Sequence, residues 1–214
     1  MKISNYPLCL IPVVLLLRLW RRFFFSVCVP VKTLLLATVW RIECGRNVKF
    51  LGRTIVRSYD KSAIKIGDDV TFTSGVTSNL VGLNGPTILC ADKGAKIEIG
   101  SSAGFSSVVI NARSNVKIGQ RVLVGGNVRI FDHDFHPLEA RYRMPPENGR
   151  MTRVKPVEIE DDVFIGTNAI ILKGTQIGAR SIVAAGSVVF GLNVPPDSLV
   201  KGNPAVIVNR VSKI

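Results

Sequence analysis

The sequence predicts an all-β fold, a parallel β-helix of six-residue repeats, preceded by a basic and apolar N-terminal segment. Three observations support this prediction. Aliphatic residues recur every six positions over residues 159–189, small residues follow them at a fixed distance, and the positive charge is concentrated before residue 66. Neither an α-helix, with a period of about 3.6, nor a flat strand, with a period of about 2, repeats every six residues.

The composition excludes several classes of protein. Of the 214 residues, 47% are hydrophobic and 20% are charged, which indicates a folded domain with a short appendage. The four cysteines form no C-x-x-C pair, so we expect neither a disulfide-stapled secreted domain nor a zinc ribbon. Residues 1–65 hold 12 Lys and Arg against 2 Asp and Glu, which accounts for +10 of the net charge of +13. Because the remainder carries only +3, a nucleic-acid partner is not expected.

The segment 1–41 has the features of a membrane-interface element. Apolar runs over residues 8–17 and 31–40 are bordered by Arg or Lys and by the two tryptophans, Trp20 and Trp40. Neither run reaches the roughly 20 apolar residues that a spanning helix needs. Trp prefers the headgroup region and Arg is attracted to anionic lipid. We therefore expect short amphipathic or apolar helices on a membrane surface, and a cytoplasmic protein that is peripheral on the inner face of the cell membrane.

Three alternatives stay open for this segment. It could pack on the protein's own core or in a subunit contact, it could be a cleaved signal peptide, or it could form a transmembrane hairpin. The signal-peptide alternative has only Lys2 as its basic region and no small-residue cleavage site after the first apolar run.

The repeat is most regular between residues 157 and 189. The aliphatic positions spaced by six are Ile159, Ile165, Ile171, Ile177, Val183 and Val189. Four residues after the first five of them stand mostly small side chains, Val163, Ala169, Thr175, Ser181 and Ser187. Asn168, Gly174 and Gly186 hold the fourth place of their hexads, where tolerance of left-handed φ is needed. We expect each hexad to be a strand plus a corner, and three hexads to complete one triangular coil that stacks on the next.

The same pattern appears less regularly from about residue 60, for example at the Ile-Gly pairs that begin at Ile66, Ile99 and Ile118. The period breaks after Ile130, where the polar residues 138–156 predict a long extruded loop, and again over residues 193–204. The predicted organisation is therefore an N-terminal segment 1–41, a β-helix domain 42–210 and a tail 211–214.

Three segments carry a resemblance to a known family: FDHDFHP (131–137), VEIEDDVFIGTNAIILKGTQIGARSIVAAGSVV (157–189) and KGNPA (201–205). In these the chain resembles the hexapeptide-repeat acyltransferases, specifically sugar O-acetyltransferases of the maltose and galactoside type and the branch that modifies bacterial surface polysaccharides. The resemblance covers residues 60–210. It implies a left-handed β-helix, a homotrimer with active sites between subunits, acetyl-CoA as acyl donor, a glycan acceptor and no metal. It also implies direct attack of the acceptor on the thioester, without an acyl-enzyme.

The two histidines of the chain, His133 and His136, both lie in FDHDFHP. Acyl transfer to a hydroxyl needs a base, and imidazole suits this task because its pKa is about 6.5. The resemblance places the catalytic His before a Pro, which assigns the general base to His136 and leaves His133 as an alternative base or an acceptor-binding residue. Asp132 and Asp134 flank His133, and either could orient a ring or be a solvated turn residue.

The resemblance also suggests binding residues. Phe164 stands where the family often has an aromatic residue at the donor–acceptor junction, Thr167 and Ala185 line the pantetheine arm, and Ser107 replaces an acceptor-binding Asn. The candidate phosphate partners are the basic residues Lys173, Arg180, Lys201 and Arg210.

Three other functions compete with acetyl transfer. A γ-type carbonic anhydrase uses the same helix but needs three His on zinc, and this chain has two. A membrane-associated, non-catalytic scaffold is the second, and the intact FDHDFHP segment argues against it. A nucleic-acid-binding protein is the third, motivated by the pI of about 10.1.

Overall fold

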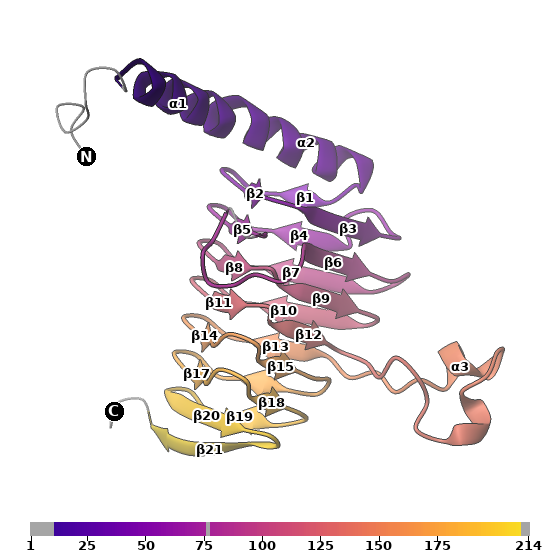
Figure 1. Cartoon of the computed structure of the whole chain (residues 1–214). Coiled ribbons are helices and arrows are strands. Elements are labelled where there is room, and N and C mark those ends of the chain that lie inside the picture. Colours follow the sequence, from indigo (N-terminus) through magenta and orange to yellow (C-terminus); the bar gives the residue numbers. More distant parts are fainter. Residues whose placement is uncertain (1–10, 76–77, 211–214) are drawn as a thin grey trace.

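The computed structural model describes residues 11–75 and 78–210 and shows a stack of β-coils with a helix across its N-terminal end (Figure 1). Successive strands enter three sheets in turn, and strands within a sheet are parallel except at the last strand. The predicted fold class, a left-handed parallel β-helix with an extruded loop, is confirmed. We call the sheets A, B and C and number the coils from the N-terminus, so that β1–β3 form coil 1.

The strands are short, and each sheet takes one strand from every coil. Sheet A contains, in stacking order, β1 (Glu43–Cys44), β4 (Ile64–Ile66), β7 (Lys96–Ile99), β10 (Asn115–Ile118), β13 (Val157–Ile159), β16 (Gln176–Ile177) and β19 (Asn193–Val194). Sheet B contains β2 (Lys49–Leu51), β5 (Thr71–Thr73), β8 (Gly104–Ser106), β11 (Leu123–Gly126), β14 (Phe164–Ile165), β17 (Ile182–Val183), β20 (Ser198–Gly202) and β21 (Ala205–Arg210). Sheet C contains β3 (Thr54–Ser58), β6 (Thr87–Ala91), β9 (Val109–Ala112), β12 (Arg129–Phe131), β15 (Ile170–Ile171) and β18 (Val188–Val189).

The core is formed by the residues that the six-residue period identified. The six aliphatic positions from Ile159 to Val189 are all buried, and so are the small residues four positions after the first five of them. In the first three coils the inward position of sheet B is aromatic. Phe50, Phe72 and Phe105 stack with ring centroids 4.8 Å apart, which matches the spacing between coils.

The corners confirm the predicted left-handed positions. Asn168, Gly174 and Gly186 have φ of 60°, 75° and 70°. Asp162 and Arg180 hold the same place in their hexads and also have positive φ, which the sequence did not suggest. Both of these side chains are engaged in ion pairs across coils, to Arg121 and Asp197, which favours the strained corner.

The N-terminal segment corrects one expectation. Instead of short helices, α1 (Ile11–Phe23), the π-helix η3 (Phe24–Cys28) and α2 (Val29–Val39) follow each other directly and form one long helix (Figure 1). The wide π turn precedes Pro30, whose ring would clash with a carbonyl four residues back in a regular α-helix. Among the described residues, Pro12–Val39 is long and apolar enough to cross a membrane by length and composition.

The helix covers the open end of coil 1. The Lys32 Nζ donates hydrogen bonds to the carbonyls of Phe50 and Gly52, and the Thr33 hydroxyl donates to the carbonyl of Val48 at 3.1 Å. At the other end, β21 pairs antiparallel with β20. These two elements occupy edges that a stack of parallel strands would otherwise leave open.

The repeat has a further interruption, which the spacing analysis missed. Residues 74–86 lie between β5 and β6 in the sequence, and their described parts, 74–75 and 78–86, form a loop at the corner between sheets B and C, which we call the 74–86 loop. The Asn127 side chain bonds this loop twice, to the Asn84 N–H at 2.9 Å and to the Gly82 carbonyl at 3.2 Å. Leu83, a residue of this loop, has a buried side chain.

The partly buried Cys44 gives a test of the packing of coil 1. Burial raises the pKa of the Cys44 thiol to about 11, so the thiol stays protonated at pH 8. We expect alkylation on the order of a hundredfold slower than for a free cysteine, whose pKa is about 8.5. Peptide mass mapping after iodoacetamide treatment, with a urea-unfolded control, measures this rate. Labelling of folded Cys44 as fast as in the control would contradict the described packing.

Candidate active site

The extruded loop leaves the β-helix after β12 and returns at β13, so residues 132–156 project from the corner between sheets C and A (Figure 1). It contains a 3-10 turn, Ala140–Tyr142, and the one-turn helix α3 (Glu147–Arg150). Its two ends are joined at the base. The Lys155 N–H donates to the Asp132 carbonyl at 2.8 Å, and the Asp134 N–H donates to the Arg153 carbonyl at 3.0 Å. FDHDFHP therefore forms the outgoing side of a closed neck.

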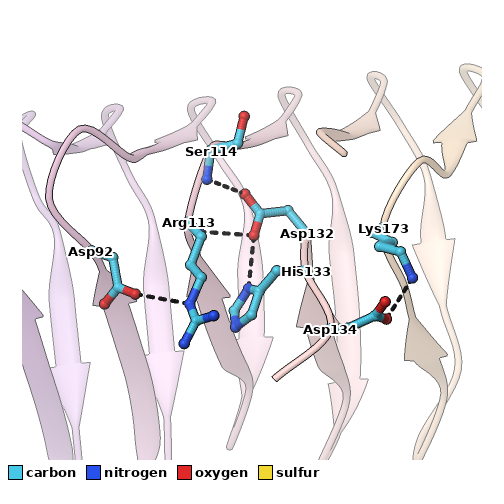
Figure 2. Close-up of polar contacts among 7 residues, drawn as sticks. All are labelled: Asp92, Arg113, Ser114, Asp132, His133, Asp134 and Lys173. Atoms are coloured by element: carbon cyan, nitrogen blue, oxygen red, sulfur yellow. Dashed lines mark hydrogen bonds and ion pairs between the residues drawn. The ribbon is translucent and has the colours of Figure 1, made fainter. Parts of the chain in front are cut away.

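Asp132 and His133 form a buried pair at this neck (Figure 2). The Asp132 carboxylate accepts bonds from the Arg113 N–H at 2.8 Å, the Ser114 N–H at 2.6 Å and the His133 Nδ1 at 2.9 Å. A buried carboxylate is stable only with such partners. A carboxylate accepts, so Nδ1 donates, and in the neutral ring the His133 Nε2 carries the lone pair. That atom is buried and has no partner among the described residues.

Other side chains surround this pair. Phe135 lies over the His133 ring, with centroids 4.7 Å apart. The Arg113 guanidinium extends beside the His133 ring and bonds Asp92 through Nε at 3.1 Å (Figure 2). A substrate hydroxyl would reach the His133 Nε2 only if this cover moved.

Asp134 has a different partner from Asp132. Its carboxylate accepts from the buried Lys173 Nζ at 2.5 Å, across to coil 5 (Figure 2). The same ammonium lies 4.6 Å from the centre of the Phe190 ring, a cation–π contact. Lys173 was predicted as a CoA phosphate partner, but here its charge is already matched by Asp134 and shielded from solvent.

His136 is the exposed histidine of the site. Its Nδ1 lies 3.1 Å from the Asn148 Oδ1, within the extruded loop. An amide oxygen only accepts, so Nδ1 carries a proton, and in the neutral ring Nε2 presents a lone pair. Neither Asp132 nor Asp134 contacts His136. Asn148 therefore takes the orienting position for which the sequence offered the two aspartates.

The predicted CoA residues lie elsewhere on the chain. Phe164 points outward from sheet B and is exposed, while Thr167 and Ala185 occupy the corner between sheets B and C. The exposed Lys201, near the end of β20, lies at the last coil of the same edge. These four residues form a column, which has sheet C between it and His136. Within one chain the structure does not bring them to the histidine.

The remaining predicted residues have these surroundings. Ser107 lies at the top of the same column, but it is buried, and its hydroxyl donates to the Gly85 carbonyl at 2.7 Å, so it anchors the 74–86 loop. Arg180 is paired with Asp197 through two bonds, at 2.6 and 2.7 Å. Arg210 ends β21, and its side chain lies outside the described part. No group of three or more His, Cys, Asp or Glu that could hold a metal occurs in the described residues.

The column combines small, apolar and basic side chains. Thr167 and Ala185 are small residues at the corner, Phe164 offers an exposed apolar surface, and Lys201 supplies an exposed cation. The packed 74–86 loop reaches this edge beside Gly126, whose neighbours include Leu83, Val81 and Thr167. A CoA site along this column stays a prediction from the sequence.

Fold and site together define a class of protein, a parallel β-helix with a histidine-bearing loop extruded from its middle coils. Residues 156–190 match a family model described as the hexapeptide repeat of succinyl-transferase. The match covers 35 of the 214 residues, and the predicted resemblance to hexapeptide-repeat acetyltransferases is confirmed by the comparisons that follow.

Three known proteins are similar to this chain. A hexapeptide-repeat acetyltransferase of Vibrio cholerae, solved with acetyl-CoA, is 27% identical with a TM-score of 0.57, covering 88% of this chain and 81% of that one. A maltose O-acetyltransferase of Clostridium difficile shares the fold, at 22% identity and a TM-score of 0.51, covering 78% and 68%. A putative acetyltransferase of Schizosaccharomyces pombe is 34% identical over 96 residues, which are 45% of this chain. That match spans 44% of the curated relative, less than half its length.

Proposed function

We propose that this protein transfers an acetyl group from acetyl-CoA to a hydroxyl of a sugar in a surface or lipid-linked glycan. The observation that carries the proposal is the exposed His136, held by Asn148 with its Nε2 free, on a hexapeptide-repeat fold. Support for the donor comes from the V. cholerae neighbour, which is solved with acetyl-CoA. Support for a sugar acceptor comes from the FDHDFHP segment and the maltose O-acetyltransferase of the same fold.

The proposed chemistry needs one base and no covalent intermediate. The His136 Nε2 accepts the proton of the acceptor hydroxyl as its oxygen attacks the thioester carbonyl. The carbon–sulfur bond breaks, the acetyl group stays on the sugar oxygen, and the proton passes from His136 to the departing CoA sulfur. Asn148 keeps the ring in the tautomer that can accept a proton.

Asp132, His133 and Asp134 hold the neck of the loop in this proposal. Asp132 binds two backbone N–H groups and His133, and Asp134 ties the neck to Lys173. These contacts fix the direction in which the loop carries His136. His133 stays the alternative base, because the Asp132–His133 pair has the geometry of an oriented base even though Nε2 is covered.

The outward faces support a homotrimer with sites between copies. Sheet A carries a ladder of alternating charge, formed by Glu43, Lys65, Glu98, Lys117 and Glu158. Sheet B instead carries the apolar row Leu123, Phe164, Ile182 and Leu199. Sheet C carries Ile55, Ile88, Val109, Arg129, Ile170 and Val188. Association through sheets B and C would leave the charged sheet A in solvent.

An acyl-transfer assay of the full chain tests this function. Acetyl-CoA is incubated with maltose, a galactoside, an amino sugar and a glycolipid extract, and the acetylated products are identified by mass spectrometry. We expect CoA release that depends on a saccharide hydroxyl. Transfer to amines alone would show that the acceptor group is an amine and not a sugar hydroxyl. An absence of both transfer and acetyl-CoA binding would favour a non-catalytic, membrane-associated scaffold.

A further inference from the structure

The N-terminal helix has a surface that the acetyl-transfer site does not use. We propose that Ile11–Val39 lies flat on an anionic phospholipid bilayer and stands the β-helix on end above it. Coil 1 then faces the membrane across the thickness of the helix. This inference concerns the attachment of the protein and does not depend on the reaction at His136.

The α2 half shows which side of the helix faces away from the protein. Val29 is buried, and Leu36, Ala37 and Trp40 pack against the core of coil 1. On the opposite side Val31, Leu34, Leu35 and Val39 are about half to two-thirds exposed, at 49%, 66%, 58% and 67%. Their spacings of three, one and four residues make them one continuous stripe of the helix. No described element of the chain covers this stripe.

The stripe continues along α1, which extends beyond the coils (Figure 1). Leu16, Trp20, Phe23 and Val27 follow at helical spacings of three and four and are exposed. On helical geometry Arg18 and Arg22 lie on the opposite face, toward the side on which Lys32 meets coil 1. An apolar face with arginines behind it is the arrangement of an interfacial helix.

Charge complementarity selects the occupant of this surface. Residues 1–65, which contain the helix and coil 1, carry +10 of the chain's +13. Basic residues near a bilayer surface each contribute about 1 kcal/mol of attraction to anionic lipid. A second copy of the chain would bring the same positive charge to the contact. We therefore commit to an anionic membrane, such as the inner face of a cell membrane.

The attachment of α2 to coil 1 argues against a spanning orientation. Lys32 and Thr33 are hydrogen-bonded to the backbone of coil 1. If Pro12–Val39 crossed the bilayer, this backbone would therefore have to lie in the hydrocarbon core as well. The described hydrogen bonds between the helix and coil 1 come from α2. The described part of the helix before α2, Ile11–Cys28, has 18 residues that measure about 27 Å and include three arginines, against a hydrocarbon core of about 30 Å.

The upright orientation fixes the height of the proposed active site. His136 follows coil 4, and coils are about 4.8 Å apart, so the site lies about 14 Å beyond coil 1. Resting on the proposed function, this favours an acceptor sugar that is separated from its lipid by further sugar units, over a sugar attached directly at the headgroup.

Vesicle flotation of the full chain tests the docking. We expect binding to phosphatidylcholine vesicles that contain phosphatidylglycerol, and much weaker binding to phosphatidylcholine alone. The double variant Leu34→Asp/Leu35→Asp should weaken binding at least about tenfold, since burying one Leu is worth roughly 1.5–3 kcal/mol. The matched control is Leu80→Asp, which places a similar charge at an exposed leucine of the 74–86 loop and should bind as wild type does.

Other outcomes of this test overturn the proposal. These are equal binding of the double variant and wild type, or no binding by either. If wild type forms oligomers in solution but does not bind vesicles, and the double variant forms no oligomers, the stripe is a contact with a second copy of the chain. Acetyl transfer to a soluble saccharide is measured without vesicles and does not depend on these results. Failure of the membrane proposal can therefore be distinguished from failure of the proposed function.

The orientation has its own measurement. A Val14→Cys variant, with Cys9 and Cys28 replaced by Ser, is bound to vesicles and treated with a membrane-impermeant maleimide. Val14 stands four residues before Arg18, on the face of the helix opposite the stripe, so a flat helix leaves residue 14 accessible and labelling should be the same before and after detergent. Labelling of residue 14 only after detergent would show a spanning helix and would overturn the flat orientation.

Discussion

Replacing His136 by Ala should lower acceptor-dependent acetyl transfer by about 10²–10⁴-fold, the range that a positioned general base supplies. His136 is exposed and hydrogen-bonds to Asn148 in the same loop, so its loss should leave the fold intact. The measurement is kcat/KM for the best acceptor found in the assay above, with circular dichroism and acetyl-CoA binding as checks on folding and on the donor site.

Variants of Asn148 and His133 distinguish a residue that acts as the general base from one that only positions the base or stabilises the loop. Asn148→Ala should lower kcat and move the pH profile, since the ring loses its tautomer partner, whereas Asn148→Asp keeps an acceptor and should retain most activity. His133→Ala removes a buried ring from the neck and should reduce stability together with activity. If His136→Ala keeps wild-type activity while a folded His133→Gln variant loses it, the base is His133 and Phe135 must move to admit the substrate.

The fold was predictable because a β-helix repeats one local rule many times. The period from Ile159 to Val189 identified inward positions that are all buried in the structure. The 74–86 loop escaped because it interrupts the less regular coils, and among its described residues Leu83 is the one buried hydrophobic side chain. The long helix escaped because the two apolar runs were treated as separate segments, whereas Pro12 lies in the first turn of α1 and a π turn directly precedes the first turn of α2, which holds Pro30.

The site was predictable in its histidines and less so in their partners. Residue types suited to acid–base chemistry can be found in a sequence, but hydrogen bonds across a loop have no period. Asn148 stands 12 positions from His136 and meets it only because the loop closes. Lys173 lies 39 positions from Asp134, and only coil stacking joins them. The separation of the CoA column from His136 is likewise a property of the triangular cross-section.

Replacing Phe72 by Ala should destabilise the N-terminal coils by about 3–5 kcal/mol, the usual cost of removing a buried phenylalanine. Phe72 is fully buried, and its ring stacks between those of Phe50 and Phe105. The cavity would remove the ring contacts that join coils 1, 2 and 3. The neighbouring strands cannot close this cavity without breaking their hydrogen-bond register. The exposed Leu80→Ala should change stability by less than about 0.5 kcal/mol and serves as the control.

Because coils interact only with their neighbours, the loss should be local. Hydrogen exchange should speed up in coils 1–3 of Phe72→Ala and stay slow in coils 5–7. Uniform exchange along the chain would contradict this one-dimensional coupling, and unchanged exchange would contradict the stacked aromatic core. Since α2 is anchored to coil 1 by Lys32 and Thr33, weakening that coil should also loosen the helix from the body. Vesicle binding of Phe72→Ala should then persist through the helix, while the β-helix loses its upright orientation.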